Sequence, residues 1–231
     1  MSSDIFFLND EDTLYWRMKA ACQEDWYNYC HHPFVQKIAD GSLPLASFRH
    51  YLQQDYLFLI HLSRAYSLAV YKSDNLEDMR SASESLNGIL GEMALHLTYC
   101  REWGLTERDI VSLPEAQANM AYTRYVLERG MAGDILDLYT ALSPCVAGYA
   151  EIGYRLKNDP NTLIAGNAYW AWIETYGGEE YLEEARKQIE RLDHLEKTRY
   201  NAARMDSLCQ TFQEATRLEI GFWQMGMDCS F

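Results

Sequence analysis

One stretch in the N-terminal half of the chain determines how it folds. Residues 48–66 read FRHYLQQDYLFLIHLSRAY. Within this stretch one series of positions recurs at steps of three and four residues, which is the helical period. The series is Phe48, Leu52, Asp55, Leu59, Leu62 and Tyr66. The spacing predicts a long amphipathic helix whose buried face carries a carboxylate among apolar side chains.

The same period extends through most of the chain. Only 5 Pro and 13 Gly interrupt it, and no alternating run of β-branched residues is present. We therefore predict an all-α fold, a single-domain helical bundle over residues 1–231. The expected helices span residues 11–30, 45–71, 76–103, 115–129, 134–157, 162–176, 179–203 and 206–225. Pro144 falls inside the fifth of these and should kink it.

Charge and composition exclude several classes of function. The chain has 20 Lys and Arg against 34 Asp and Glu, a net charge of −14. Such a surface opposes phosphate backbones and anionic lipids, so we expect no nucleic-acid partner and no membrane partner. Neither a leader segment nor a membrane-spanning run is apparent, which favours a cytoplasmic protein whose six cysteines stay reduced.

Two acids occupy core positions on separate helices. Asp55 does so in the stretch above, and Glu219 does so in the series Leu208, Phe212, Ala215, Glu219 and Phe222. A buried carboxylate is either hydrogen-bonded for structural reasons or lines a polar pocket. Two of them on long helices indicate a shared cavity, where they would bind metal, act as acid and base, or hold a polar ligand.

The helix over 134–157 places Cys145 and Tyr149 one turn apart on its apolar face. Cys145 directly follows Pro144, so it is either a small core residue or a thiol beside space opened by the kink. The chain also has 17 tyrosines, among them Tyr122 and Tyr169. A cluster of tyrosines can stack on an aromatic heterocycle and bind its ring nitrogens, although a single tyrosine more often packs in the core.

Metal and cofactor chemistry finds little support in the sequence. A di-iron bundle needs Glu-x-x-His on two helices, and that spacing does not occur on the expected helices. Glu92 and His96 stand at i and i+4, but zinc would need further ligands, and a local structural pair explains them. Isolated histidines such as His32 favour helix capping over haem ligation. We expect no metal and no cofactor.

Several short motifs occur in a fixed order on the expected helices. They are HPFV at 32–35, DGSLP at 40–44, FRHYLQQDY at 48–56, AYT at 121–123, PCVAGYAEIG at 144–153, YWAWIETY at 169–176 and EIGFW at 219–223. Together they resemble the TenA family, the thiaminase-2 enzymes of the haem-oxygenase-like superfamily. Cys145 places the chain with the members that carry a cysteine on the helix.

The resemblance implies a haem-oxygenase-like bundle, usually a homotetramer, that hydrolyses 4-amino-5-aminomethyl-2-methylpyrimidine to the 5-hydroxymethyl compound in thiamin salvage. Thiamin itself would be a second, slower substrate. Carried over by motif, Cys145 is the nucleophile that adds to the pyrimidine ring and Glu219 the acid that helps the leaving group depart. Asp55 would read the amidine edge of the pyrimidine. The pocket tyrosines are expected at three positions, Tyr149, Tyr169 and Tyr122.

Phe58 departs from the family pattern, because several members carry a tyrosine three residues after the motif aspartate. Phe58 would place an aromatic ring in the substrate pocket but would lack the hydroxyl of that tyrosine. Two alternatives stay open: another haem-oxygenase-like enzyme, such as an oxidase of quinone biosynthesis, and a non-catalytic pyrimidine-binding or regulatory protein of the same fold.

Overall fold

The computed structural model describes residues 3–102 and 104–231, and every regular element in them is helical, which confirms the all-α prediction. The elements are η1 (Ser3–Asn9), α1 (Leu14–Ala21), α2 (Gln23–Cys30), α3 (Pro33–Ala39), α4 (Leu45–Lys72), α5 (Leu76–Glu102), α6 (Glu107–Val111), α7 (Gln117–Ala132), α8 (Ile135–Asn158), α9 (Trp170–Tyr176), α10 (Glu179–Arg199), η2 (Ala202–Arg204) and α11 (Met205–Asp228). Within these ranges no helix is both long and apolar enough to cross a bilayer.

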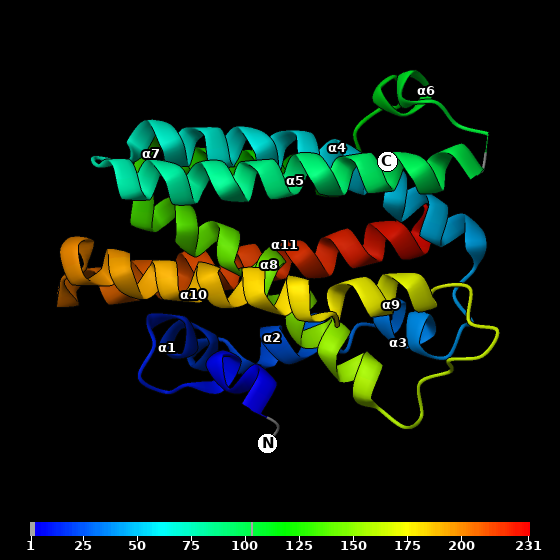
Figure 1. The fold of residues 1–231 in the computed structure, drawn as a ribbon, viewed down its shortest axis with the longest axis horizontal. Helices are drawn as coiled ribbons and strands as arrows, with labels where there is room; N and C mark the ends of the chain where they lie inside the picture. The colour runs from blue at the N-terminus through cyan, green and yellow to red at the C-terminus, as the bar shows by residue number, and fades with distance from the viewer. Residues whose placement is uncertain (1–2, 103) are drawn as a thin grey trace.

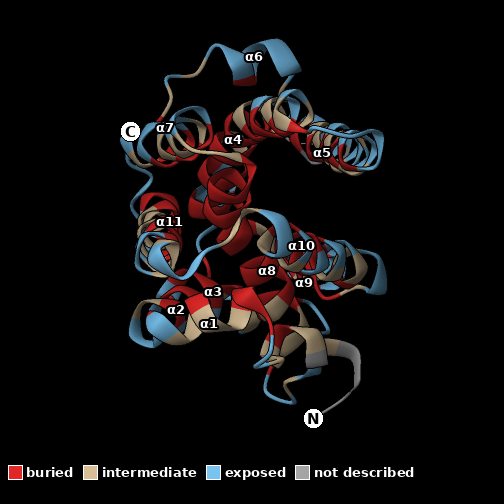
Figure 2. Cartoon of the chain, turned by 90° about the vertical axis from the view of Figure 1, so that its left-hand side faces the viewer, coloured by how far each residue is buried: buried red, intermediate tan, exposed pale blue. Residues whose placement is uncertain are grey.

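The long helices lie in layers around α8 (Figures 1 and 2). Helices α4, α5 and α7 form one layer, α8, α10 and α11 the next, and the short helices α1 to α3 cover the far side. Helix α8 packs on α2, α4, α7, α9, α10 and α11. It can be buried on all sides because its sequence from Ile135 to Leu156 is dominated by apolar and small residues. The helix continues through Pro144.

The predicted helix over 11–30 is two helices in the structure. They meet at Cys22, whose backbone is not helical (φ −133°, ψ 40°). The break lets rings from both helices contact one residue of α11: Tyr15 and Trp26 lie with their ring centroids 5.8 and 5.5 Å from that of Phe212. No Pro or Gly marks this point, so the periodicity alone could not locate it.

The predicted helix over 162–176 was also wrong in its first half. Only Trp170–Tyr176 is helical, and the preceding loop is bound to α3. Asn167 donates from Nδ2 to the Ile38 carbonyl oxygen at 2.9 Å, and its Oδ1 accepts the Tyr169 amide at 2.8 Å. An asparagine that satisfies backbone groups in this way competes with helix formation. The short helices α3 and α6 were not anticipated.

Helices α8 and α9 approach each other backbone to backbone. A Cβ on Gly153 would lie 2.3 Å from the carbonyl carbon of Tyr176, and one on Gly177 would lie 2.5 Å from the Gly153 oxygen. Only glycine permits this contact at both positions. The contact sets the position of Tyr176 relative to α8, where Cys145 and Tyr149 lie.

Candidate active site

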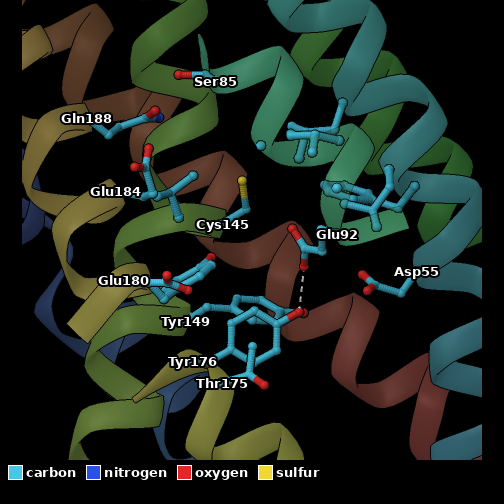
Figure 3. A pocket seen from close by; sticks show the side chains of 18 of the residues that line it. Asp55, Ser85, Glu92, Cys145, Tyr149, Thr175, Tyr176, Glu180, Glu184 and Gln188 are labelled. Carbon is cyan, nitrogen blue, oxygen red and sulfur yellow. Dashed lines mark hydrogen bonds between the residues drawn. The ribbon is translucent and has the colours of Figure 1, made fainter. Parts of the chain in front are cut away.

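A cavity of about 750 Å³ lies among α4, α5, α7, α8, α9, α10 and α11. Among the residues that line it are six that the sequence proposed for the site: Asp55, Phe58, Tyr122, Cys145, Tyr149 and Glu219. They come from four helices. On each helix the spacing of three and four residues predicts a buried face, and these faces meet at the cavity (Figure 3 shows Asp55, Cys145 and Tyr149).

Cys145 is the only nucleophilic thiol among the cavity-lining residues that the structure describes. Its Sγ donates to the Leu142 carbonyl oxygen at 3.1 Å, a bond within α8 that fixes the direction of the side chain. Burial raises the pKa of the thiol well above its usual value, and the charges of Glu219 and Glu92 add to this, while a hydrogen bond with Tyr122 opposes it. The resting group is therefore a thiol, and it needs a base to react.

Glu219 is the acid that the sequence analysis expects to work together with that thiol. Its side chain is 2% exposed, and its Oε1 accepts a hydrogen bond from the Tyr122 hydroxyl at 2.9 Å. Burial raises the pKa of Glu219 to about 8, with a contribution from the charge of Asp55, although the Tyr122 bond opposes it. Glu219 thus carries a proton at neutral pH for most of the time and can both give and take one. The Tyr122 hydroxyl donates to Glu219 and also favours the ionised form of the Cys145 thiol, so it influences both groups.

Asp55 forms a buried pair with His96, a residue that the sequence analysis pairs with Glu92. The Nε2 atom of His96 lies 2.7 Å from Oδ2 of Asp55, and both residues are at most 5% exposed. Nδ1 of His96 donates to the Glu92 carbonyl oxygen at 3.1 Å. Burial disfavours the imidazolium, but the hydrogen bond and charge of Asp55 and the charge of Glu92 raise the pKa of His96 to about 9. The pair is therefore a carboxylate with an imidazolium at neutral pH.

Glu92 lines the cavity as well, so Glu92 and His96 are more than the local pair that their spacing indicates, although Nδ1 of His96 does bond to the Glu92 carbonyl oxygen. The side chain of His96 reaches across to α4, and the Glu92 carboxylate accepts a hydrogen bond from the Tyr176 hydroxyl at 2.7 Å. Ligand atoms of Asp55, Glu92 and His96 lie within 4.8 Å of one another. In the structure Asp55 and His96 form an ion pair, and Glu92 beside them bonds to Tyr176.

Aromatic rings form much of the remaining wall. The hydroxyls of Tyr149 and Tyr51 are 3.2 Å apart, and the Tyr149 ring centroid lies 4.9 Å from that of Tyr176. Phe58 packs with its centroid 5.1 Å from Tyr122 and 5.6 Å from Phe222. Phe58 thus contributes a ring face, and Tyr122 supplies the hydroxyl that Glu219 binds.

Tyr169 is the one proposed residue that the structure does not bring to the cavity. Its hydroxyl donates to the Leu43 carbonyl oxygen, and its ring packs on Phe48 with centroids 4.6 Å apart. Tyr176, seven residues later in the same motif, lines the cavity. The two tyrosines stand at opposite ends of the YWAWIETY segment, and the sequence carries no signal that chooses between them unless the start of α9 is known.

The fold and the site define the class of the protein as an all-helical bundle around a cavity lined by a thiol, several carboxylic acids and several tyrosines. The chain belongs to the TENA/THI-4/PQQC family, whose profile matches residues 19–229.

Curated proteins and solved structures agree with this assignment. An uncharacterised protein of Haemophilus influenzae is 44% identical over 89% of this chain and 95% of its own length. An aminopyrimidine aminohydrolase of Halalkalibacterium halodurans is 35% identical over 88% of this chain and 90% of its own. The crystal structure of a TenA family transcription regulator from Silicibacter sp. TM1040 superposes with a TM-score of 0.87 at 43% identity and covers 93% of this chain and 96% of that one.

Proposed function

We propose that this chain is an aminopyrimidine aminohydrolase. It would convert 4-amino-5-aminomethyl-2-methylpyrimidine and water into the 5-hydroxymethyl compound and ammonia, with thiamin as a second substrate. Relatives that bear the name aminopyrimidine aminohydrolase support the reaction class. The observation that carries the proposal is the connected set of Cys145, Tyr122 and Glu219 inside one buried cavity.

Recognition of the ring falls to Asp55 in this proposal. A carboxylate oxygen accepts from the 4-amino group and faces the amidine edge of the pyrimidine. His96 holds that carboxylate and balances its charge, so the binding of a neutral ring does not leave an unpaired buried anion. Tyr149 and Phe58 supply flat faces for the aromatic ligand.

The chemistry then runs through the thiol and Glu219. The Cys145 sulfur bonds to the ring carbon next to the 5-substituent, while its proton passes through Tyr122 to ionised Glu219. Glu219 gives that proton to the amine, the carbon–nitrogen bond breaks, and ammonia leaves an exocyclic methylene behind. Water adds to this methylene and returns a proton to Glu219. The carbon–sulfur bond breaks, the ring becomes aromatic again, and the thiol regains its proton.

Ammonia release tests the proposal. The wild-type chain, incubated with the aminomethylpyrimidine, should release one ammonia for each hydroxymethylpyrimidine formed. Glu219→Gln should lose more activity on this substrate than on thiamin, whose thiazolium leaves without taking a proton. Binding without ammonia release would instead make the chain a pyrimidine-binding protein. Equal losses on both substrates would remove the donor role from Glu219.

The homotetramer and the cytoplasmic, thiamin-salvage setting belong to the same proposal. Light scattering on the purified chain tests the tetramer directly. A monomer or dimer at micromolar concentration would contradict it.

A further inference from the structure

Glu92 lines the cavity beside Asp55, yet neither the motifs nor the proposed mechanism assigns it a role. It lies on α5, and its carboxylate points into the space that Cys145 and Asp55 also face (Figure 3). The carboxylate accepts a hydrogen bond from the Tyr176 hydroxyl at 2.7 Å. That bond holds the carboxylate in place from one side and leaves acceptor positions free, since an ionised carboxylate has about four.

The charges around Glu92 do not balance. Asp55 pairs with His96 at 2.7 Å, and Glu219 holds its own proton at neutral pH. The ion pairs of the described residues include none that involves Glu92. When Glu92 is ionised, two carboxylates and one imidazolium leave one negative charge in this part of the cavity wall. Burial raises the pKa of Glu92, which shows that its charge is costly there until a cation arrives.

The remaining glutamates of the cavity wall differ from Glu92 in their access to water. They are Glu174, Glu179, Glu180 and Glu184, all on or beside α9 and α10, and all are exposed. Water solvates and screens a charge at such a position, so these residues attract a ligand cation only weakly. Among the described acids, Glu92 is therefore the one that would gain most from a cation inside the cavity.

We propose that Glu92 binds the nitrogen of the substituent at ring carbon 5 and stabilises the positive charge on it. This rests on the proposed function, because it uses the ring orientation given above. With the amidine edge on Asp55 and the neighbouring ring carbon at Cys145, the 5-substituent points between these two residues. Glu92 lies between them in the cavity (Figure 3).

Glu92 would discriminate among substrates by the charge and the hydrogen-bond donors of the 5-substituent. The amine can donate hydrogen bonds to Glu92, and the positive charge that it gains with the proton from Glu219 is attracted to the same carboxylate. A thiazolium nitrogen has the charge but no hydrogen to donate. A hydroxymethyl group has no charge, so it gains no charge–charge attraction from an anion. Glu92 therefore favours amine-bearing substrates over thiamin, and both over the neutral product, which helps the product leave.

Calorimetric binding at pH 7 tests this, on a Cys145→Ser background so that no ligand is consumed. In this background the aminomethyl compound should bind more tightly than the hydroxymethyl compound. Adding Glu92→Gln should weaken binding of the aminomethyl compound about tenfold or more, the value of a hydrogen bond to a charged group. Binding of the hydroxymethyl compound should change less than about twofold, because glutamine still accepts the Tyr176 hydroxyl.

Glu214→Gln is the matched control. Glu214 also accepts from a tyrosine, Tyr125 at 2.6 Å, but it does not line the cavity. It should leave the binding of both ligands unchanged, and Glu92→Asp should restore part of the preference for the amine.

The outcomes separate this inference from the function on which it rests. Equal weakening of both ligands by Glu92→Gln would overturn the role of Glu92 and leave the function standing. A Cys145→Ser protein that prefers the neutral ligand would do the same without any change at Glu92. A protein that binds neither pyrimidine would overturn both.

Discussion

The raised pKa of Glu219 makes a prediction about stability that does not depend on the substrate. Its folded value of about 8 lies above the ordinary 4.5. Between these two values the folded chain binds more protons at this site than the unfolded chain, so the free energy of unfolding falls as pH rises. Glu219→Gln removes the titration while keeping an oxygen that can accept the Tyr122 hydroxyl.

The magnitude follows from the shift. Each unit of difference in pKa is worth about 1.4 kcal/mol, so the advantage of Glu219→Gln over wild type should grow from near zero at pH 4.5 to roughly 5 kcal/mol above pH 8. At pH 7 it should reach roughly 3 kcal/mol, which for a domain of this size is an increase in Tm of about 6–12 °C.

Urea denaturation followed by circular dichroism, at half-unit steps from pH 4.5 to 8.5, measures this difference. Glu214→Gln on the same helix serves as the control. The Tyr125 hydrogen bond lowers the pKa of Glu214, so Glu214 contributes stability above its ordinary pKa that is lost on acidification. That loss falls near and below pH 4.5, so from pH 5 to 8.5 the difference between Glu214→Gln and wild type should stay nearly constant. A difference between Glu219→Gln and wild type that stays flat with pH would mean that the pKa of Glu219 is not raised in the folded protein, and it would contradict the protonated resting state.

Three further changes test other parts of the molecule. Cys145→Ser should abolish ammonia release while circular dichroism and pyrimidine binding stay near wild type; turnover in the variant would exclude covalent catalysis. His96→Gln should destabilise most below pH 6.5, with a loss that shrinks by roughly 3 kcal/mol as pH rises through 9, because His96 contributes stability in its charged form. A urea series at pH 6 and pH 9 measures this, and equal losses at both would refute it. Gly148→Ala places a Cβ 2.2 Å from Cε1 of Tyr29 and should cost about 1–3 kcal/mol in thermal unfolding, whereas wild-type stability would show that α2 and α8 can separate freely.

Periodicity predicted the parts of this fold that obey one rule over many residues. The long helices α4, α8 and α11 follow apolar stripes, and the spacing alone is enough to assign a polar residue on such a stripe to the interior. Asp55 and Glu219 were found in that way. The break at Cys22 could not be found, because it results from packing of Tyr15 and Trp26 against a helix far away in the sequence.

The missed site residues have a similar cause. His96 bonds to Asp55, 41 residues earlier, and Glu92 accepts a hydrogen bond from Tyr176, 84 residues later. Their i, i+4 spacing indicates a pair within one helix. In the structure each of the two side chains instead bonds to a residue of another helix. Tyr169 is assigned to the pocket by the family resemblance, and the structure places Tyr176 of the same motif at the cavity, because a loop held by Asn167 replaces the first half of the expected helix.

The glycine contact between α8 and α9 has a consequence for how such a pocket can diverge. Tyr176 is positioned by main-chain atoms of Gly153 and Gly177, whose spacing no side-chain exchange can adjust, so its place beside Tyr149 is inherited with the backbone. Helix α5, which carries Glu92, packs chiefly on α4 through side chains. Substitutions on α5 can therefore accumulate without moving Cys145 or Tyr176. One side of the cavity is thus free to vary in its side chains, whereas the side formed by α8 and α9 is fixed by the backbone.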